Sequence, residues 1–72
     1  MSAKEMFKKL GYKEDRDENG VTYYKPVNRN QEIQIQIRYK EIRKLNADTL
    51  YAEGITLAEF KAIKKEVKEL GW

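Results

Sequence analysis

Two stretches of the sequence end in the same way, and they constrain the fold more than any other feature. Phe7–Tyr12 and Val67–Trp72 both read apolar, Lys, charged, Leu, Gly, aromatic. This order is typical of a helix that ends in a Schellman motif, where Gly adopts the left-handed conformation and the aromatic residue folds back onto the apolar one. The chain is therefore expected to begin and end with helices, and Trp72 is expected to be a buried core aromatic.

The starts of both helices are also marked. Ser2 with Glu5, and Thr56 with Glu59, fit the capping box, in which a hydroxyl and a carboxylate satisfy the first backbone N–H groups. The first helix is predicted over about residues 3–10 and the second from this box to residue 70. At helical spacing, the apolar face of the second helix comprises Phe60, Ile63, Val67 and Leu70.

The middle of the chain predicts β-strands. Residues 32–39 alternate strictly between apolar and polar, which is the period of a half-buried strand. Ile33, Ile35, Ile37 and Tyr39 should share the buried face, and Gln34, Gln36 and Arg38 the open face. A strand of this kind belongs to a sheet that is covered on one side only.

The neighbouring strands are predicted from turn signals. Asn19-Gly20 indicates a type I′ hairpin between strands at residues 12–17 and 21–25. Pro26 should end the second strand or lie on an edge, and residues 28–30 should form the next turn. Residues 40–52 are ambiguous: 42–46 fit a fourth strand after a tight turn at Lys40-Glu41, but helical spacing is also present. The strand is preferred, because a meander needs only a short connection.

These elements predict one α+β domain over residues 1–72. Its order is helix, antiparallel meander of three to four strands, helix, with both helices on one face of the sheet. Phe, Leu, Ile and Val make up just over a fifth of the residues, close to the composition at which disorder becomes the default. A core this small is thinly stabilised, so homodimer formation would be one way to bury more apolar surface.

Several chemistries are excluded or disfavoured by composition. The chain has no Cys and no His, which excludes disulfides, thiolate zinc sites, Cys nucleophiles and His general bases. Thr and Ser hydroxyls have no base to activate them. We therefore expect no catalytic residue, no cofactor and no enzyme activity. No apolar run is long enough to span a bilayer, and the start lacks the apolar centre of a signal peptide, so a cytoplasmic location is expected.

One segment superficially resembles a calcium loop. Residues 15–20 fit the first six positions of an EF-hand, but the twelfth position, which should be a bidentate Glu, is Pro26. Acidic residues and Asn also suit an ordinary turn. We expect a hairpin turn and no metal site.

Two basic arrays are candidates for binding a partner. On the second helix, the side chains of one stripe about 100° wide form what we call the lysine stripe, which comprises Lys61, Lys64, Lys65 and Lys68. Glu59, Glu66 and Glu69 are expected on the opposite flank of the apolar face. Like charges three and four residues apart are mildly destabilising, and such a stripe suits an acidic protein surface or a phosphate backbone. The alternative is a solvated Lys/Glu surface without function.

The open face of the sheet is the second candidate. Its predicted binding residues are Gln34, Gln36, Arg38, Arg43 and Lys44, and one of the adjacent Tyr23 and Tyr24 should join them. An aromatic ring among Gln and Arg on a sheet is a surface on which bases can stack. The interleaved aromatic and glycine signature of an RNA-recognition motif is absent, however, and open faces with Gln are common.

The two ends of the chain carry a family resemblance. The opening Glu5-Met6-Phe7-Lys8-Lys9-Leu10-Gly11-Tyr12, and the close from Phe60-x-x-Ile63 through Glu69-Leu70-Gly71-Trp72, resemble short uncharacterised proteins of Gram-positive bacteria and their prophages, bracketed by "MFxxLGY" and "ELGW". The resemblance covers both ends, leaves the middle unmatched and implies no functional residues. It implies a small cytoplasmic accessory protein, for which binding is a commoner role than catalysis.

The leading hypothesis is a non-enzymatic module that binds a protein partner, such as a host factor of a phage, through one of the basic arrays. The alternative is nucleic-acid binding through the Gln/Arg face of the sheet. The salt dependence of binding would distinguish the two, because counterion release makes nucleic-acid complexes steeply salt-sensitive.

Overall fold

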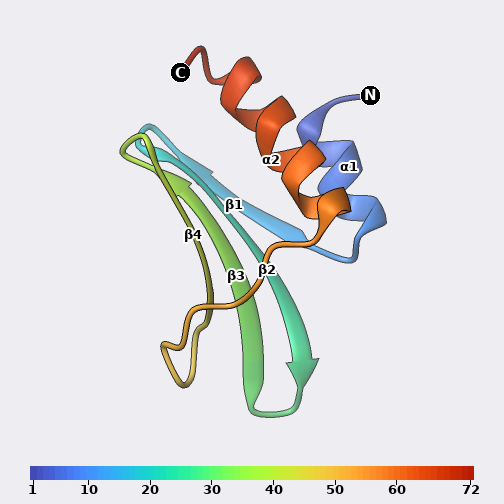
Figure 1. The fold of residues 1–72 in the computed structure, drawn as a ribbon, viewed down its shortest axis with the longest axis vertical. Helices are drawn as coiled ribbons and strands as arrows, with labels where there is room; N and C mark the ends of the chain where they lie inside the picture. The colour runs from blue at the N-terminus through green and yellow to red at the C-terminus, as the bar shows by residue number, and fades with distance from the viewer.

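The structure, a computed structural model, describes all 72 residues and has the expected α+β order (Figure 1). A four-stranded antiparallel sheet with strand order β1-β2-β3-β4 follows one helix and precedes another. The elements are α1 (Ala3–Lys9), β1 (Lys13–Asp17), β2 (Gly20–Asn28), β3 (Gln31–Arg38), β4 (Glu41–Asn46) and α2 (Leu57–Glu69). The fourth strand confirms the meander over the helical alternative for residues 42–46.

Both helices begin and end as their sequences predict. Ser2 and Thr56 are N-caps of complete capping boxes with Glu5 and Glu59. At the end of α1, the Tyr12 N–H donates to the Phe7 carbonyl over 3.0 Å, and Gly11 has a φ of 92°.

The same hydrogen bond closes α2, where the Trp72 N–H donates to the Val67 carbonyl over 3.1 Å. Gly71 has a φ of 75°. These are the hydrogen bonds of the Schellman motif, so the repeated hexamer ends a helix in both places.

The two helices lie side by side on one face of the sheet and cover only one end of it (Figure 1). The turn between β2 and β3 and the loop after β4 extend beyond them. Pro26 lies in this uncovered part: β2 continues to Asn28, but β1 pairs with it only as far as Tyr24. The Pro26 nitrogen, which has no hydrogen to donate, therefore interrupts no ladder with β1.

The predicted type I′ turn is at a different hairpin. Asp17 pairs with Gly20, so the β1–β2 loop is Glu18-Asn19, and neither loop residue has a positive φ. Gly20 begins β2 at a φ of 139°, and a Cβ there would lie 2.2 Å from the Ile37 carbonyl oxygen. Glycine is therefore required at this position by the close approach of β3.

Tyr39 and Lys40 have φ values of 54° and 61° and join β3 to β4. Arg38 pairs with Glu41, so this is a two-residue loop with both residues left-handed, as in a type I′ turn. The turn lies one residue earlier than expected, and Tyr39 leaves the buried face of β3 as a consequence.

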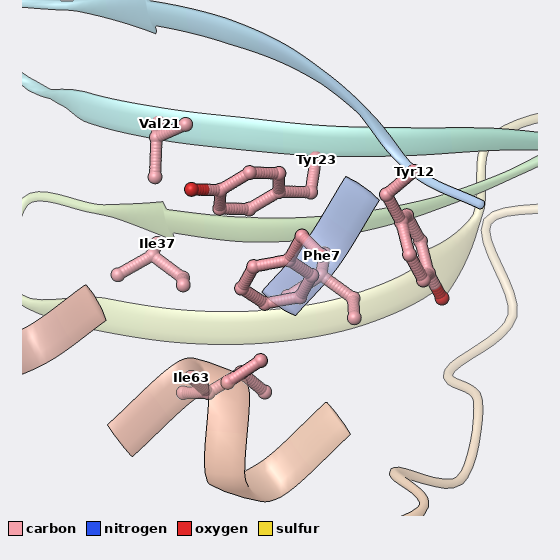
Figure 2. Packing of buried hydrophobic residues seen from close by; sticks show 8 residues of the cluster. Phe7, Tyr12, Val21, Tyr23, Ile37 and Ile63 are labelled. Carbon is pink, nitrogen blue, oxygen red and sulfur yellow. The ribbon is translucent and has the colours of Figure 1, made fainter. Parts of the chain in front are cut away.

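The core lies between the helices and the central strands (Figure 2). The Phe7 ring of α1 stacks on the Tyr23 ring of β2 with centroids 3.7 Å apart, and the Tyr12 ring meets Phe7 edge-on at 5.7 Å. Ile35 and Ile37 of β3 are fully buried, and Ile33 is partly buried against the same cluster. The alternation of residues 32–39 was therefore correctly assigned to the two faces as far as Arg38.

Two aromatic residues predicted to be buried are not. Trp72 is 37% exposed and Phe60 is 54% exposed. The reason is the rotation of α2: its fully covered residues are Glu59, Ala62, Ile63 and Glu66. Val67 and Leu70 are partly buried against the core, and Phe60 lies next to Val67 on the flank of the helix that faces away from the buried residues. Glu59 and Glu66 thus lie on a buried part of α2 that the apolar pattern predicts to be exposed to solvent.

Candidate binding surfaces

The open face of the sheet carries most of the residues predicted for it. The register places Gln34, Gln36 and Arg38 of β3 on this face, with Arg43 of β4 directly opposite Gln36. Tyr24 of β2 pairs with Gln34, so Tyr24 is the tyrosine on the open side, whereas Tyr23 is buried.

Arg38 is held by the sheet itself. Its guanidinium donates to the Thr22 hydroxyl over 2.8 Å, to the Asp17 carboxylate over 2.6 Å and to the Asp15 carbonyl over 3.0 Å. The Asn19 N–H and Arg38 lower the pKa of Asp17 below its ordinary value. Arg38 would have to give up these contacts to bind a phosphate. Asp17 is likewise occupied, which fits the interpretation of residues 15–20 as a turn.

The glutamines of this face are also internally paired. The Gln36 amide donates to the Gln34 side chain over 3.0 Å, and the Gln34 amide donates to the Glu32 carboxylate over 2.8 Å. By register the face has four carboxylates against three basic side chains: Asp15, Asp17, Glu32 and Glu41, with Lys13, Arg38 and Arg43. This face is therefore not a basic surface.

Lys44 is not on the open face, which corrects the prediction. It pairs with Ile35, so its side chain lies on the helix side of the sheet, where it is only 11% exposed. Its ammonium group donates to the Glu59 carboxylate over 2.8 Å and to the Gly54 carbonyl over 2.7 Å. Arg43 and Lys44 are consecutive residues of β4, and consecutive side chains of a strand point to opposite faces, so the two cannot both lie on the open face.

Two buried carboxylates of α2 were not identified from the sequence. Glu59 and Glu66 are 5% and 1% exposed. Glu59 accepts hydrogen bonds from the Tyr12 hydroxyl, over 2.6 Å, and from Lys44.

Glu66 accepts from the Tyr23 hydroxyl over 2.5 Å and from the Arg16 guanidinium over 2.7 Å. Each carboxylate therefore has one tyrosine and one cation as partners. The available signal was their spacing: seven residues apart, they share one face of the helix, opposite the lysine stripe.

The electrostatics of these clusters follow from burial and pairing. Burial raises the pKa of Glu59, but the hydrogen bonds from Lys44, Tyr12 and the Thr56 N–H outweigh it and lower the pKa to about 2. Burial and the carboxylate partners raise the pKa of both Tyr12 and Tyr23. The hydrogen bond to Glu66 raises the pKa of Arg16.

The carboxylates of Glu59 and Glu66 hold elements together and are covered from solvent. Glu59 links α2 to β4 and to Tyr12 at the end of α1, and Glu66 links it to β1 and β2. Glu69 accepts from the Ala3 N–H over 3.2 Å at the start of α1. All three glutamates of α2 that were expected to flank its apolar face thus have structural partners.

The lysine stripe is free of such partners. Lys61, Lys64, Lys65 and Lys68 take part in none of the four salt bridges of the protein, whose basic members are Arg16, Arg38 and Lys44. The stripe lies on the side of α2 opposite its buried residues. The four lysines and Met6 of α1 line a hollow of about 270 Å³.

Comparisons with known proteins do not identify a relative. Searches against protein-family models, curated proteins and solved structures find no significant match. Neither of the two helices is long and apolar enough to cross a lipid bilayer.

Proposed function

We propose that this protein is a non-enzymatic interaction module that binds an acidic protein partner through the lysine stripe. The single observation that supports this is the absence of acidic partners: four ammonium groups share one side of α2, and no carboxylate pairs with any of them. Isolated like charges at this spacing disfavour the helix, so an external acidic partner would relieve the repulsion.

The other basic residues support this choice by contrast. Arg38 and Lys44 are bonded to Asp17 and Glu59, and Arg16 is bonded to Glu66. Their charges are therefore already satisfied within the fold. Among the residues predicted as partner-binding, Arg43 is the one basic residue outside α2 without an ion pair, whereas α2 brings four such residues together.

The setting proposed for this activity is the cytoplasm, since a cysteine-free chain suits a reducing compartment. The resemblance of the chain ends to prophage proteins favours an accessory role, in which the partner is a host factor. The cytoplasmic setting and the host-factor partner are proposed from the sequence.

Nucleic-acid binding through the open face is the second candidate. Tyr24 lies beside Gln34 and Arg38 around a hollow of about 560 Å³, and an aromatic ring in such a place could stack on a base. The same hollow is lined by Asp15 and Glu32, which would repel phosphates. We therefore rank this function below the first.

Charge reversal tests the proposal. Immobilised protein with Lys61→Glu and Lys65→Glu is compared with wild type in a pull-down from host extract, followed by identification of the bound protein. The control is Lys40→Glu with Arg43→Glu, which changes the net charge equally at exposed sites of the β3–β4 hairpin. We expect the helix variant to lose its partner and the control to keep it.

The helix variant should stay folded, and its thermal stability should rise slightly, because the new carboxylates face Lys64 and Lys68. If wild type and the helix variant retain the same proteins, the proposal is wrong. Loss in the control alone would select the open face, and release of bound nucleic acid by moderate salt would then support the second candidate.

A further inference from the structure

The hollow within the lysine stripe is apolar at its base. It is formed where α1 packs beside α2, and Met6 is its one hydrophobic residue. Nearly all the surface that lines it is carbon, contributed by Met6 and by the aliphatic stems of the four lysines. Lysine side chains commonly cover apolar surface in this way while their ammonium groups remain in water.

The size of the hollow limits what it can hold. Its volume of about 270 Å³ lies below the range of roughly 300–1,000 Å³ typical of pockets for cofactors and drug-sized ligands. It is open and shallow, so it suits one apolar side chain that enters from a partner. Met6 is partly buried against the core cluster, and its flexible thioether can adapt to different side chains.

The charges around the hollow define the surroundings of that side chain. Lys61 and Lys68 are seven residues apart, so the stripe extends about 10 Å along the helix axis. Lys64 and Lys65 lie between them. A partner that inserts an apolar group at Met6 would therefore meet ammonium groups on both sides of it.

We propose that the lysine stripe recognises an acidic protein segment in which one apolar side chain is flanked by carboxylates. The apolar side chain contacts Met6 and the lysine stems, and the flanking carboxylates pair with the ammonium groups. This inference rests on the proposed function and specifies its partner. A phosphate backbone would satisfy the charges but has no apolar group for the hollow, and the stripe has no aromatic ring for a base.

The two contributions respond differently to salt. Ion pairs between exposed groups weaken as ionic strength rises, whereas burial of an apolar side chain does not depend on screening. An acidic segment with the apolar side chain should therefore keep its advantage over a purely acidic one at high salt.

Three fluorescent probes of similar charge test this with the wild-type protein. The first is a glutamate peptide of about ten residues with one central leucine, a length that exceeds the stripe. The second has serine in place of the leucine, and the third is a single-stranded DNA oligonucleotide. Fluorescence anisotropy gives the dissociation constants at low and at physiological ionic strength.

We expect the leucine peptide to bind roughly tenfold more tightly than the serine peptide, which corresponds to burial of part of one apolar side chain. The ratio should persist at the higher ionic strength, and the DNA should bind more weakly than the leucine peptide. Equal binding of the two peptides, or tightest binding of the DNA, would overturn the inference.

Two variants locate the site. Met6→Gln should reduce the preference for leucine to near unity while the serine peptide still binds, whereas Met6→Leu should preserve the preference. Circular dichroism shows whether each variant is folded. If Met6→Gln does not fold, the comparison of the two peptides on the wild-type protein still tests the inference.

Lys61→Glu with Lys65→Glu should abolish binding of both peptides. Undiminished binding to that variant would contradict the proposed function itself. Binding of both peptides to the wild-type protein without a preference for leucine would contradict only the inference about the hollow.

Discussion

Glu59 and Glu66 are the residues on which the attachment of α2 depends most. Each is a carboxylate in a nearly dry environment, and each is balanced by a tyrosine hydroxyl and a cation. Such a pair adds little compared with an apolar contact of similar size, but removing one partner leaves an uncompensated group. The buried face of this helix therefore tolerates substitution poorly, although it contains few apolar residues.

Glu66→Ala should lower the free energy of unfolding by about 3 kcal/mol, because it leaves the Tyr23 hydroxyl and part of the Arg16 guanidinium without an acceptor. Glu18→Ala, in the exposed β1–β2 loop, is the control and should change it by less than about 0.5 kcal/mol. Urea unfolding measures both. Similar changes in the free energy of unfolding for the two variants would show that the Glu66 cluster does not stabilise the fold.

Because the pKa of Glu59 is low, the free energy of unfolding should depend on pH in the acidic range. Its ordinary value is 4.5, and in the fold it is about 2, so the stabilisation is complete above pH 4.5 and is lost as the pH falls towards 2. The loss is on the order of 3 kcal/mol. Thermal melts of wild type and Glu59→Gln across this range should converge at the acid end, because the variant has no proton to gain there. Parallel curves would contradict this.

At the scale of elements, the hairpins show how local sequence and close packing compete. The Asn-Gly pair at residues 19–20 would suit a type I′ turn, but Gly20 is used where β3 approaches, and the left-handed loop consists of Tyr39 and Lys40. Left-handed residues other than glycine cost roughly 1–2 kcal/mol each. The β3–β4 turn therefore holds conformational strain that the pairing of the strands compensates.

Replacing that loop with the preferred sequence should relieve the strain. Tyr39→Asn with Lys40→Gly should raise the free energy of unfolding by about 1 kcal/mol, since both new residues accept positive φ. Gly20→Ala should do the opposite and destabilise strongly, because its Cβ would overlap the Ile37 carbonyl. Chemical unfolding distinguishes these outcomes, and a loop variant no more stable than wild type would be evidence against the strain.

At the scale of the whole molecule, the two helices cover the sheet unevenly. The helices lie over one end of the sheet, and the core cluster lies beneath them (Figures 1 and 2). On β4, the Lys44 carbonyl and the Asn46 N–H point away from β3 towards residues 53 and 51. Because outward groups alternate along a strand, the Ile42 N–H also faces outward, and it has no backbone partner.

Hydrogen exchange should reproduce this pattern. We expect the amides of Tyr23, Ile35 and Ile37 to exchange slowest, near the limit of global unfolding, because they lie in paired strands under the helices. The Ile42 amide should exchange much faster than that of Arg43, although both are in β4. Uniform protection along β4 would indicate that its outer edge is covered, as a second subunit would do.

The sequence by itself determined the parts of this protein that depend on neighbours along the chain. Capping boxes, Schellman ends and the alternation of β3 use contacts within about six residues, so their signals are local and were read correctly. Four of the five residues predicted on the open face, and all four of the lysine stripe, followed from the same periodicities. Lys44 was assigned to the open face wrongly, because alternation places it on the face opposite to that of its neighbour Arg43.

The tertiary structure alone decided which residues became buried partners. Apolar patterning favoured Phe60 and Trp72 for the core, whereas the fold turns Glu59 and Glu66 inward. Their burial is stable only because tyrosines and cations from β1, β2, β4 and the end of α1 meet them across 15 to 50 positions of sequence. A carboxylate on a helix has no local property that distinguishes a solvated position from a paired one. The distinction arises when the partners are brought together.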